Sequence, residues 1–162
     1  MPILEKILFA LTFMSALGSG LIAGVFFIFS VAIMRALERV AGGMAAMQSI
    51  NIVILNPMFL GVFMGTALLC VGVAIASVLR WPPPGSTWLI AGALFYLIGS
   101  IGITIVLNVP MNNALVAADP GTPEGQKIWS DYLSNWTFWN HVRTVASLIS
   151  SASFMVGLTY LR

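Results

Sequence analysis

The ten residues 135–144, NWTFWNHVRT, hold an unusual share of this chain's polar side chains. They include two tryptophans, two asparagines, one arginine and the single histidine, and the sequence after them is mainly apolar. A polar group inside a membrane protein is costly unless it is paired or faces a cavity, so it is a candidate for function. This stretch is therefore the first place to look for chemistry.

Two other segments bring amides to the same end of the molecule. The polar residues that flank the apolar runs are Asn51 and Asn56 before the second run, Asn108, Asn112 and Asn113 after the third, and Asn140, His141 and Arg143 at the start of the fourth. Three separate segments thus converge on one layer near one membrane face. The sequence predicts a polar site in that layer.

Helical spacing divides these residues into faces. Trp136, Asn140, Arg143 and Ser147 share one face of a helix, and Asn108 and Asn112 share another. At about 100° per residue, His141 points roughly 200° away from Arg143 in a regular helix. The two side chains then cannot face one pocket unless the helix begins after the histidine. A neutral imidazole bonded to a neighbour is the simpler alternative for His141.

Composition places these residues in a membrane. Hydrophobic residues make up 59% of the 162 residues, charged residues make up 7%, and the mean hydropathy is +0.99. A span needs about 20 apolar residues, and such runs occur at residues 7–34, 57–79, 87–107 and 139–161. The sequence predicts an all-α fold, a four-helix integral membrane bundle with a single domain over residues 1–162.

An even number of spans puts both ends of the chain on one side of the membrane. The positive charges nearly balance between that side and the other: Lys6, Arg80 and Arg162 against Arg35, Arg39, Lys127 and Arg143. If the arginines near helix ends belong to the site, the remaining balance predicts both termini in the cytoplasm. A tight turn at WPPPGS joins the second and third spans.

The two connections on the far side are long. The first is an amphipathic connection after Arg35, and the second holds a predicted turn at NVPMN, a turn-rich centre ADPGTPEG and an aromatic-rich segment. In that segment Trp129, Tyr132, Trp136 and Trp139 recur every three or four residues and form one helical stripe. Placement at the membrane interface is the simpler explanation of each ring.

Small residues recur along the spans and predict close helix packing. They are Ala16, Gly20 and Gly24 in the first span, Gly61 and Gly65 in the second, and Gly92, Gly99 and Gly102 in the third. This pattern favours a compact bundle and leaves a homo-oligomer open.

Metal chemistry has little support in the sequence. One histidine, one distant cysteine (Cys70) and scattered carboxylates form no recognisable ligand pattern in one subunit. No metal is therefore expected, and a haem held by two histidines would need two chains. A hydrophobic small molecule and the lipid bilayer are the expected partners, with no nucleic acid.

Three stretches carry a family resemblance: GLIAGVFFIFS, NVPMNNAL and WTFWNHVRTVAS. They resemble the anthrone oxygenase-like family of small four-helix membrane proteins, many of which are domains of unknown function. The resemblance implies an oxidoreductase, a monooxygenase that converts an anthrone to an anthraquinone without metal or flavin. An anthrone has an acidic methylene group whose enolate can pass an electron to dioxygen. The protein would then supply a base, donors for the developing charge and a dry cavity.

Under this resemblance the candidate catalytic residues are His141 as the base, Arg143, which stabilises the enolate or peroxide, and Asn140 as an amide donor to a substrate oxygen. The candidate binding residues are the amide donors Asn108 and Asn112, the stacking rings Trp136 and Trp139, and the further asparagines Asn51 and Asn113. If His141 points elsewhere, solvent or the substrate's own acidity must replace it. The alternative is a non-enzymatic membrane module that binds a quinone, lipid, haem or partner protein, with transport as a third possibility.

Overall fold

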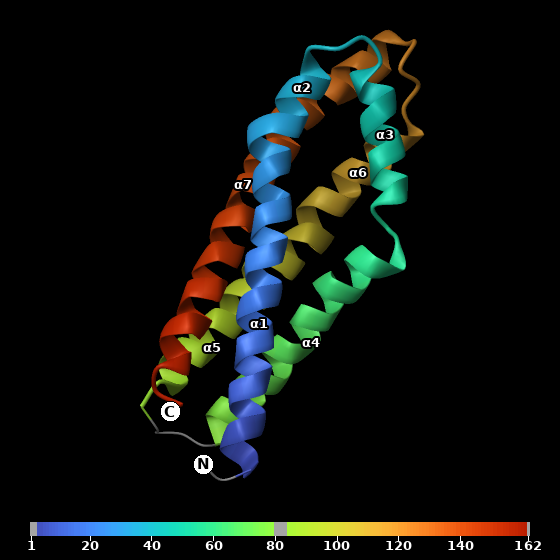
Figure 1. Cartoon of the computed structure of the whole chain (residues 1–162). Coiled ribbons are helices and arrows are strands. Elements are labelled where there is room, and N and C mark those ends of the chain that lie inside the picture. Colours follow the sequence, from blue (N-terminus) through green and yellow to red (C-terminus); the bar gives the residue numbers. More distant parts are fainter. Residues whose placement is uncertain (1–2, 80–83, 162) are drawn as a thin grey trace.

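The computed structural model describes residues 3–79 and 84–161, and in these ranges it is helical without any strand (Figure 1). Three helices are long and apolar enough to cross a membrane: Ile3–Glu38, Pro57–Leu79 and Ser86–Ala117. A fourth long helix, α7 (Pro123–Leu158), packs lengthwise against the first. This arrangement confirms the predicted all-α membrane bundle. α7 is not among these apolar helices, since Asn140, His141 and Arg143 lower its hydropathy. A membrane crossing by α7 therefore stays a prediction.

The first and third apolar helices are each assembled from several segments that follow one another without a break. The first comprises α1 (Ile3–Ile28), the π-helical turn η1 (Phe29–Ile33) and α2 (Met34–Glu38). The third comprises α5 (Ser86–Leu94), the π-helical segments η2 (Phe95–Gly102) and η3 (Thr104–Asn108), and α6 (Val109–Ala117). π-Helical turns are rare and widen a helix locally, and they often occur at functional sites.

The turn predicted at NVPMN is wrong, because this stretch is helical from η3 into α6. Pro110 lies in the first turn of α6, directly after the π-helical segment. A proline disturbs a helix when it removes an N–H of the regular pattern, and that cost is smallest at a first turn. The third helix therefore extends ten residues beyond the predicted end of the span at residue 107.

The two long connections are largely helical. The first contains α3 (Gly43–Val53), which meets α6 at the upper end of the bundle in Figure 1. Gln48 fixes this contact, since its Nε2 donates to the carbonyl oxygens of Leu115 and Ala118, at 2.8 Å each. The second connection turns at residues 118–122, as predicted, and Thr122 then caps α7 through a 3.0 Å bond from Gly125 N. The aromatic stripe and the fourth predicted span therefore form one continuous helix.

Small and hydroxyl residues bring α7 against α1 and α5. Ser151 donates to Ala16 O at 2.9 Å, and Ser150 donates to Gly92 O at 2.7 Å. A Cβ on Gly92 would lie 2.9 Å from the ring of Phe154, so close packing requires this glycine. Gly24, Gly61 and Gly65 differ from the prediction, because a Cβ at each of them would meet nothing within 4 Å, so close packing does not require a glycine there.

The start of α1 and the end of α7 lie at the same end of the bundle (Figure 1). Arg80, the first half of WPPPGS and Arg162 lie outside the described residues. The number of spans and the cytoplasmic placement of the termini remain predictions.

Candidate functional site

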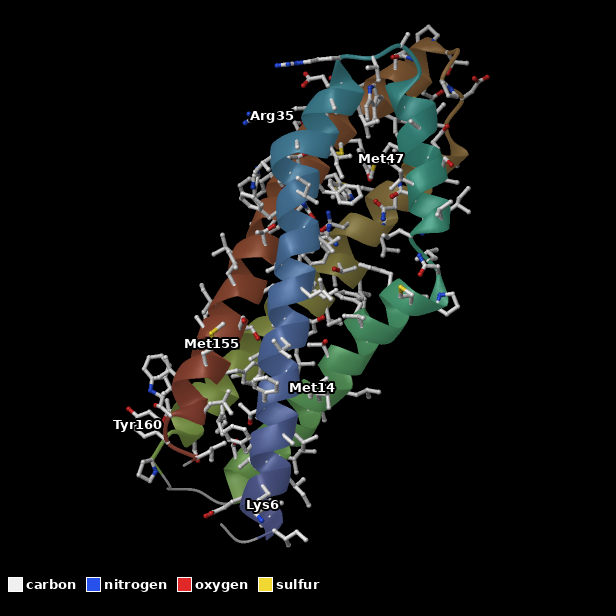
Figure 2. The ribbon with its side chains drawn as sticks, in the orientation of Figure 1. Lys6, Met14, Arg35, Met47, Met155 and Tyr160 are labelled. Carbon is white, nitrogen blue, oxygen red and sulfur yellow. The ribbon has the colours of Figure 1, made fainter. Side chains whose placement is uncertain are left out.

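A cavity of about 230 Å³ lies inside the upper half of the bundle. Its walls come from α1 with η1, from α3, from α4 (Pro57–Leu79), from η3 with α6, and from α7. Most of the lining is apolar and aromatic, including Phe26, Phe29, Phe59 and Phe63. Met47 of α3 belongs to the lining, and Figure 2 shows it between the upper helices.

Five of the predicted site residues line this cavity. They are Asn51, Asn112, Trp136, Asn140 and Arg143. The structure thus brings together three segments that are far apart in the sequence, at the end of the bundle that the sequence indicates. The predicted face of α7 also holds, because Trp136, Asn140, Arg143 and Ser147 are all buried.

Arg143 is the one charged residue among those that line the cavity. Its side chain is 5% exposed. Its Nη1 donates to Thr104 Oγ1 at 3.0 Å and its Nη2 to Asn140 Oδ1 at 2.6 Å, whereas its Nε has no partner within residues 3–79 and 84–161. Both partners are neutral, and an arginine stays protonated in proteins. The guanidinium therefore keeps a positive charge that no carboxylate in these contacts neutralises.

Two aromatic rings make cation–π contacts with this guanidinium. The Cζ of Arg143 lies 4.2 Å from the ring centroid of Phe26 and 5.3 Å from that of Trp136. Each such contact is worth about 0.5–2 kcal/mol, the larger value when water is excluded. Trp136 continues a stack with Tyr132 and Trp129, at centroid distances of 5.4 and 5.9 Å. Its indole Nε1 is buried and has no partner among the described residues, so it is a second available donor.

Asn140 positions Arg143. The side chain is fully buried, and its Nδ2 donates to Phe26 O and to Ser30 Oγ, at 2.6 Å each. These two bonds orient the amide so that its Oδ1 faces the guanidinium. Ser30 lies in η1 and Thr104 in η3, so both outer side-chain partners of the Asn140–Arg143 pair are presented by π-helical turns.

Asn108 supports the site without lining the cavity. It is fully buried, and its Nδ2 donates to the main-chain oxygen of Trp136 at 3.3 Å. Asn108 and Asn112 share a face of the third helix, as predicted. The structure assigns the first of them to positioning Trp136 and the second to the cavity wall.

Tyr132 links the side-chain amides of Asn51 and Asn112, which both line the cavity. Its hydroxyl donates to Asn112 Oδ1 at 2.9 Å and accepts from Asn51 Nδ2 at 3.4 Å. Burial raises the pKa of Tyr132, and the Asn51 hydrogen bond and the charge of Arg143 oppose this effect only in part. The phenol is therefore neutral and acts as a donor at physiological pH.

Three predicted site residues lie outside the cavity. His141 is exposed and lines a separate polar pocket of about 440 Å³ with Glu38 and Thr137. Because α7 is a regular helix here, the rotation of about 200° from Arg143 turns the imidazole away from the cavity. Asn113 is exposed, and Trp139 is half-buried against Phe138 at 5.2 Å.

Sequence reasoning missed several residues of the site. Phe26 and Thr104 lie in apolar runs without any signal that separates them from their neighbours. Ser30 is the single polar residue within residues 21–34, but nothing in the sequence links it to Asn140. Tyr132 was recognised as part of the aromatic stripe but not as a hydrogen-bonding residue.

No group of three or more His, Cys, Asp or Glu side chains able to hold a metal occurs in the described part of the chain. Cys70, the free thiol, is fully buried in the lower core and does not line the cavity.

The fold and the cavity define a helical membrane protein with a buried cation at the wall of an apolar chamber. Residues 58–153 match the family model described as anthrone oxygenase, which covers more than half of the chain. The chain belongs to the anthrone oxygenase family. No curated protein and no solved structure matches it. The matched residues include Thr104, Asn108, Asn112, Trp136, Asn140 and Arg143.

Proposed function

We propose that this protein is a membrane-embedded oxygenase that uses dioxygen to convert an anthrone-like polycyclic phenol to a quinone, without metal or flavin. The observation that supports this most is the protonated Arg143 guanidinium, which has neutral partners and a free Nε at the wall of an apolar cavity. A buried charge is costly unless something pairs with it. An oxyanion formed on a bound aromatic substrate would be that partner.

The cavity suits a flat aromatic ligand whose oxygen points toward Arg143. The rings of Phe26 and Trp136 flank the guanidinium and offer apolar faces to the ligand. Arg143 Nε and Trp136 Nε1 are the donors without partners. Both protons of the Asn140 amide are already donated to Phe26 O and Ser30, so in this proposal Asn140 positions Arg143 and does not bind substrate.

The reaction begins when the methylene group of the anthrone loses a proton. The described residues that line the cavity include no carboxylate and no imidazole, so the acceptor is a water molecule or hydroxide bound in the cavity. The positive charge of Arg143 stabilises the enolate and so makes the substrate more acidic. This fixed charge acts strongly because the cavity walls are apolar.

The enolate then passes one electron to dioxygen. The superoxide and the carbon radical combine, and the new C–O bond gives a peroxide on the former methylene carbon. The O–O bond breaks as the second hydrogen of that carbon leaves as a proton. One oxygen atom stays as the quinone carbonyl and the other leaves as water, so one dioxygen is consumed for each quinone formed.

This proposal is tested with the purified protein in detergent and an anthrone as substrate, by oxygen uptake and quinone absorbance on one sample. The expected result is accelerated uptake with one dioxygen per quinone. Protein that binds the anthrone without accelerating its oxidation would refute the proposal.

One observation favours a second candidate function, a non-enzymatic module that binds a quinone-like ligand. The described cavity lining lacks a side chain able to accept a proton at neutral pH, whereas Arg143 and Trp136 are both donors suited to a quinone oxygen. Tight quinone binding without turnover of any anthrone would support this candidate.

A further inference from the structure

We propose that the cavity is entered sideways from the hydrocarbon region of the bilayer, through a mouth between α4 and the η3–α6 segment. Its ligand then belongs to the class of compounds that dissolve in lipid as neutral molecules. This inference rests on the proposed function only for the reaction that follows entry. The mouth itself is argued from exposure, packing and hydrogen bonds.

The mouth is defined by side chains that line the cavity and are also exposed at the outer surface. Leu55 and Met64 on one side are 64% and 47% exposed, and Ile105 and Val109 on the other are 61% and 38% exposed. All four are apolar. A rim of this kind is compatible with lipid chains and gives water no hydrogen-bonding partner.

The packing of the helices explains why an opening occurs there. α4 packs against α1, α5 and η2, and its upper end diverges from α6 (Figure 1). α3 packs instead against α2 and α6. The break between α3 and α4 is fixed by Asn56, whose Oδ1 accepts from Phe59 N at 3.0 Å and whose Nδ2 donates to Val53 O at 3.0 Å. The two helices therefore meet at an angle beside the mouth.

At the end away from the mouth, the cavity is bounded by a hydrophobic cluster that includes the lining residue Met47. Met44, Met47, Leu115 and Trp129 are buried together in this cluster, between α3, α6 and α7. Gln48 holds α3 onto the end of α6 through its two bonds to Leu115 O and Ala118 O. A ligand from the aqueous phase would have to separate this cluster, whereas a ligand from lipid meets an existing opening.

The test uses a thiol placed in the cavity and two maleimides that differ in solubility. In Met47→Cys the thiol replaces a lining side chain that is 1% exposed. The protein is held in lipid nanodiscs, where both aqueous faces are accessible. N-phenylmaleimide dissolves in lipid, and a sulfonated maleimide stays in water. The wild-type protein, whose Cys70 is fully buried outside the cavity, gives the background rate.

The matched pair of blocking variants is Ile105→Trp and Val106→Trp. Ile105 lies on the rim, while Val106 is 68% exposed and does not line the cavity. We expect N-phenylmaleimide to label Met47→Cys, and Ile105→Trp to slow this labelling about tenfold or more, which corresponds to a barrier higher by about 1.4 kcal/mol. Val106→Trp should leave the rate unchanged, and the sulfonated reagent should label at the background rate.

Faster labelling by the sulfonated reagent, equal slowing by both tryptophan variants, or no labelling by either reagent would overturn the lateral mouth. No substrate is present in this experiment. Its outcome is therefore distinct from that of the oxygen-uptake assay, and an inactive protein with a lipid-facing mouth would still be recognised.

Discussion

Replacing Arg143 with methionine removes the buried charge while keeping a side chain that fills much of the same space. We expect this substitution to change the free energy of unfolding only moderately. Thr104 Oγ1 keeps its 2.7 Å bond to Ser100 O, and only Asn140 Oδ1 loses a donor, which costs about 1–3 kcal/mol. The cation–π contacts with Phe26 and Trp136 are also lost, at about 0.5–2 kcal/mol each. Removing a buried charge that has no carboxylate among these contacts recovers its desolvation penalty, on the order of several kcal/mol. The gain and the losses are similar in size, so the free energy of unfolding should change by no more than about 3 kcal/mol.

The same substitution should lower the reaction rate much more strongly. Loss of a single preorganised oxyanion donor lowers kcat by about 100- to 1,000-fold, and Arg143 carries a full charge in an apolar cavity. We expect Arg143→Met to lower the rate of oxygen uptake with an anthrone by at least about 100-fold. The assay is oxygen uptake with quinone absorbance, together with thermal unfolding in the same detergent.

The control is Arg39→Met, which removes an exposed charge that does not line the cavity. It should match the wild type in both measurements. A folded Arg143→Met protein that turns over at the wild-type rate would refute the role of the buried cation. An Arg143→Met protein that no longer folds would show that the bundle needs the charge for stability. That result would contradict the limited change expected in the free energy of unfolding.

The remaining predictions concern His141, Asn140 and Tyr132. His141→Ala should keep a rate close to that of the wild type, because the side chain is exposed and lies outside the cavity, and a marked loss in oxygen uptake would restore the histidine as base. Asn140→Ala should lower the free energy of unfolding by about 1–3 kcal/mol because it removes the acceptor of Arg143 Nη2 and the side-chain donor to Phe26 O. Asn113→Ala, at an exposed site, should not lower it, and equal chemical denaturation curves for the two variants would contradict this. The folded-state pKa of Tyr132 is raised by burial, so its contribution to stability is complete below the unfolded pKa of about 10 and is lost as pH rises above it. Tyr132→Phe should therefore reduce the fall in unfolding temperature between pH 9 and pH 11, about the pKa of a free phenol, and an unchanged fall would contradict the buried neutral phenol.

The spacing of residues predicted the helices and the face of α7 that forms the site. Uncharged runs predict where the apolar helices lie. The rotation of about 100° per residue predicts that the side chains of His141 and Arg143 point in different directions. Helical spacing identifies the buried face of α7 because Asn140 and Arg143 stand among apolar neighbours in the sequence. The contrast between polar and apolar residues is what makes a helical face visible in a sequence.

That contrast is missing where a helix faces both core and lipid. Phe26 is 5% exposed and Phe27 is 53% exposed, yet over residues 21–29 both faces of the first helix are apolar, because lipid and protein interior have similar polarity. Nothing in the sequence therefore selects Phe26 as the ring beside Arg143. The π-helical turns at Ser30 and Thr104 also give no periodic signal, and the helix after NVPMN follows from such a turn, so the predicted break there was wrong.

The lateral mouth and the buried cation together constrain the ligand more than either does alone. A compound that crosses lipid to reach the mouth must be neutral, since a permanent charge is excluded from hydrocarbon. The ligand that gains most from Arg143 is an anion. Both requirements are met by a weak acid that enters protonated and loses its proton beside the guanidinium, as an anthrone or a phenol does. A carboxylate satisfies only the second requirement and a hydrocarbon only the first, so Arg143→Met should weaken binding of an ionisable phenol and leave that of its methyl ether unchanged.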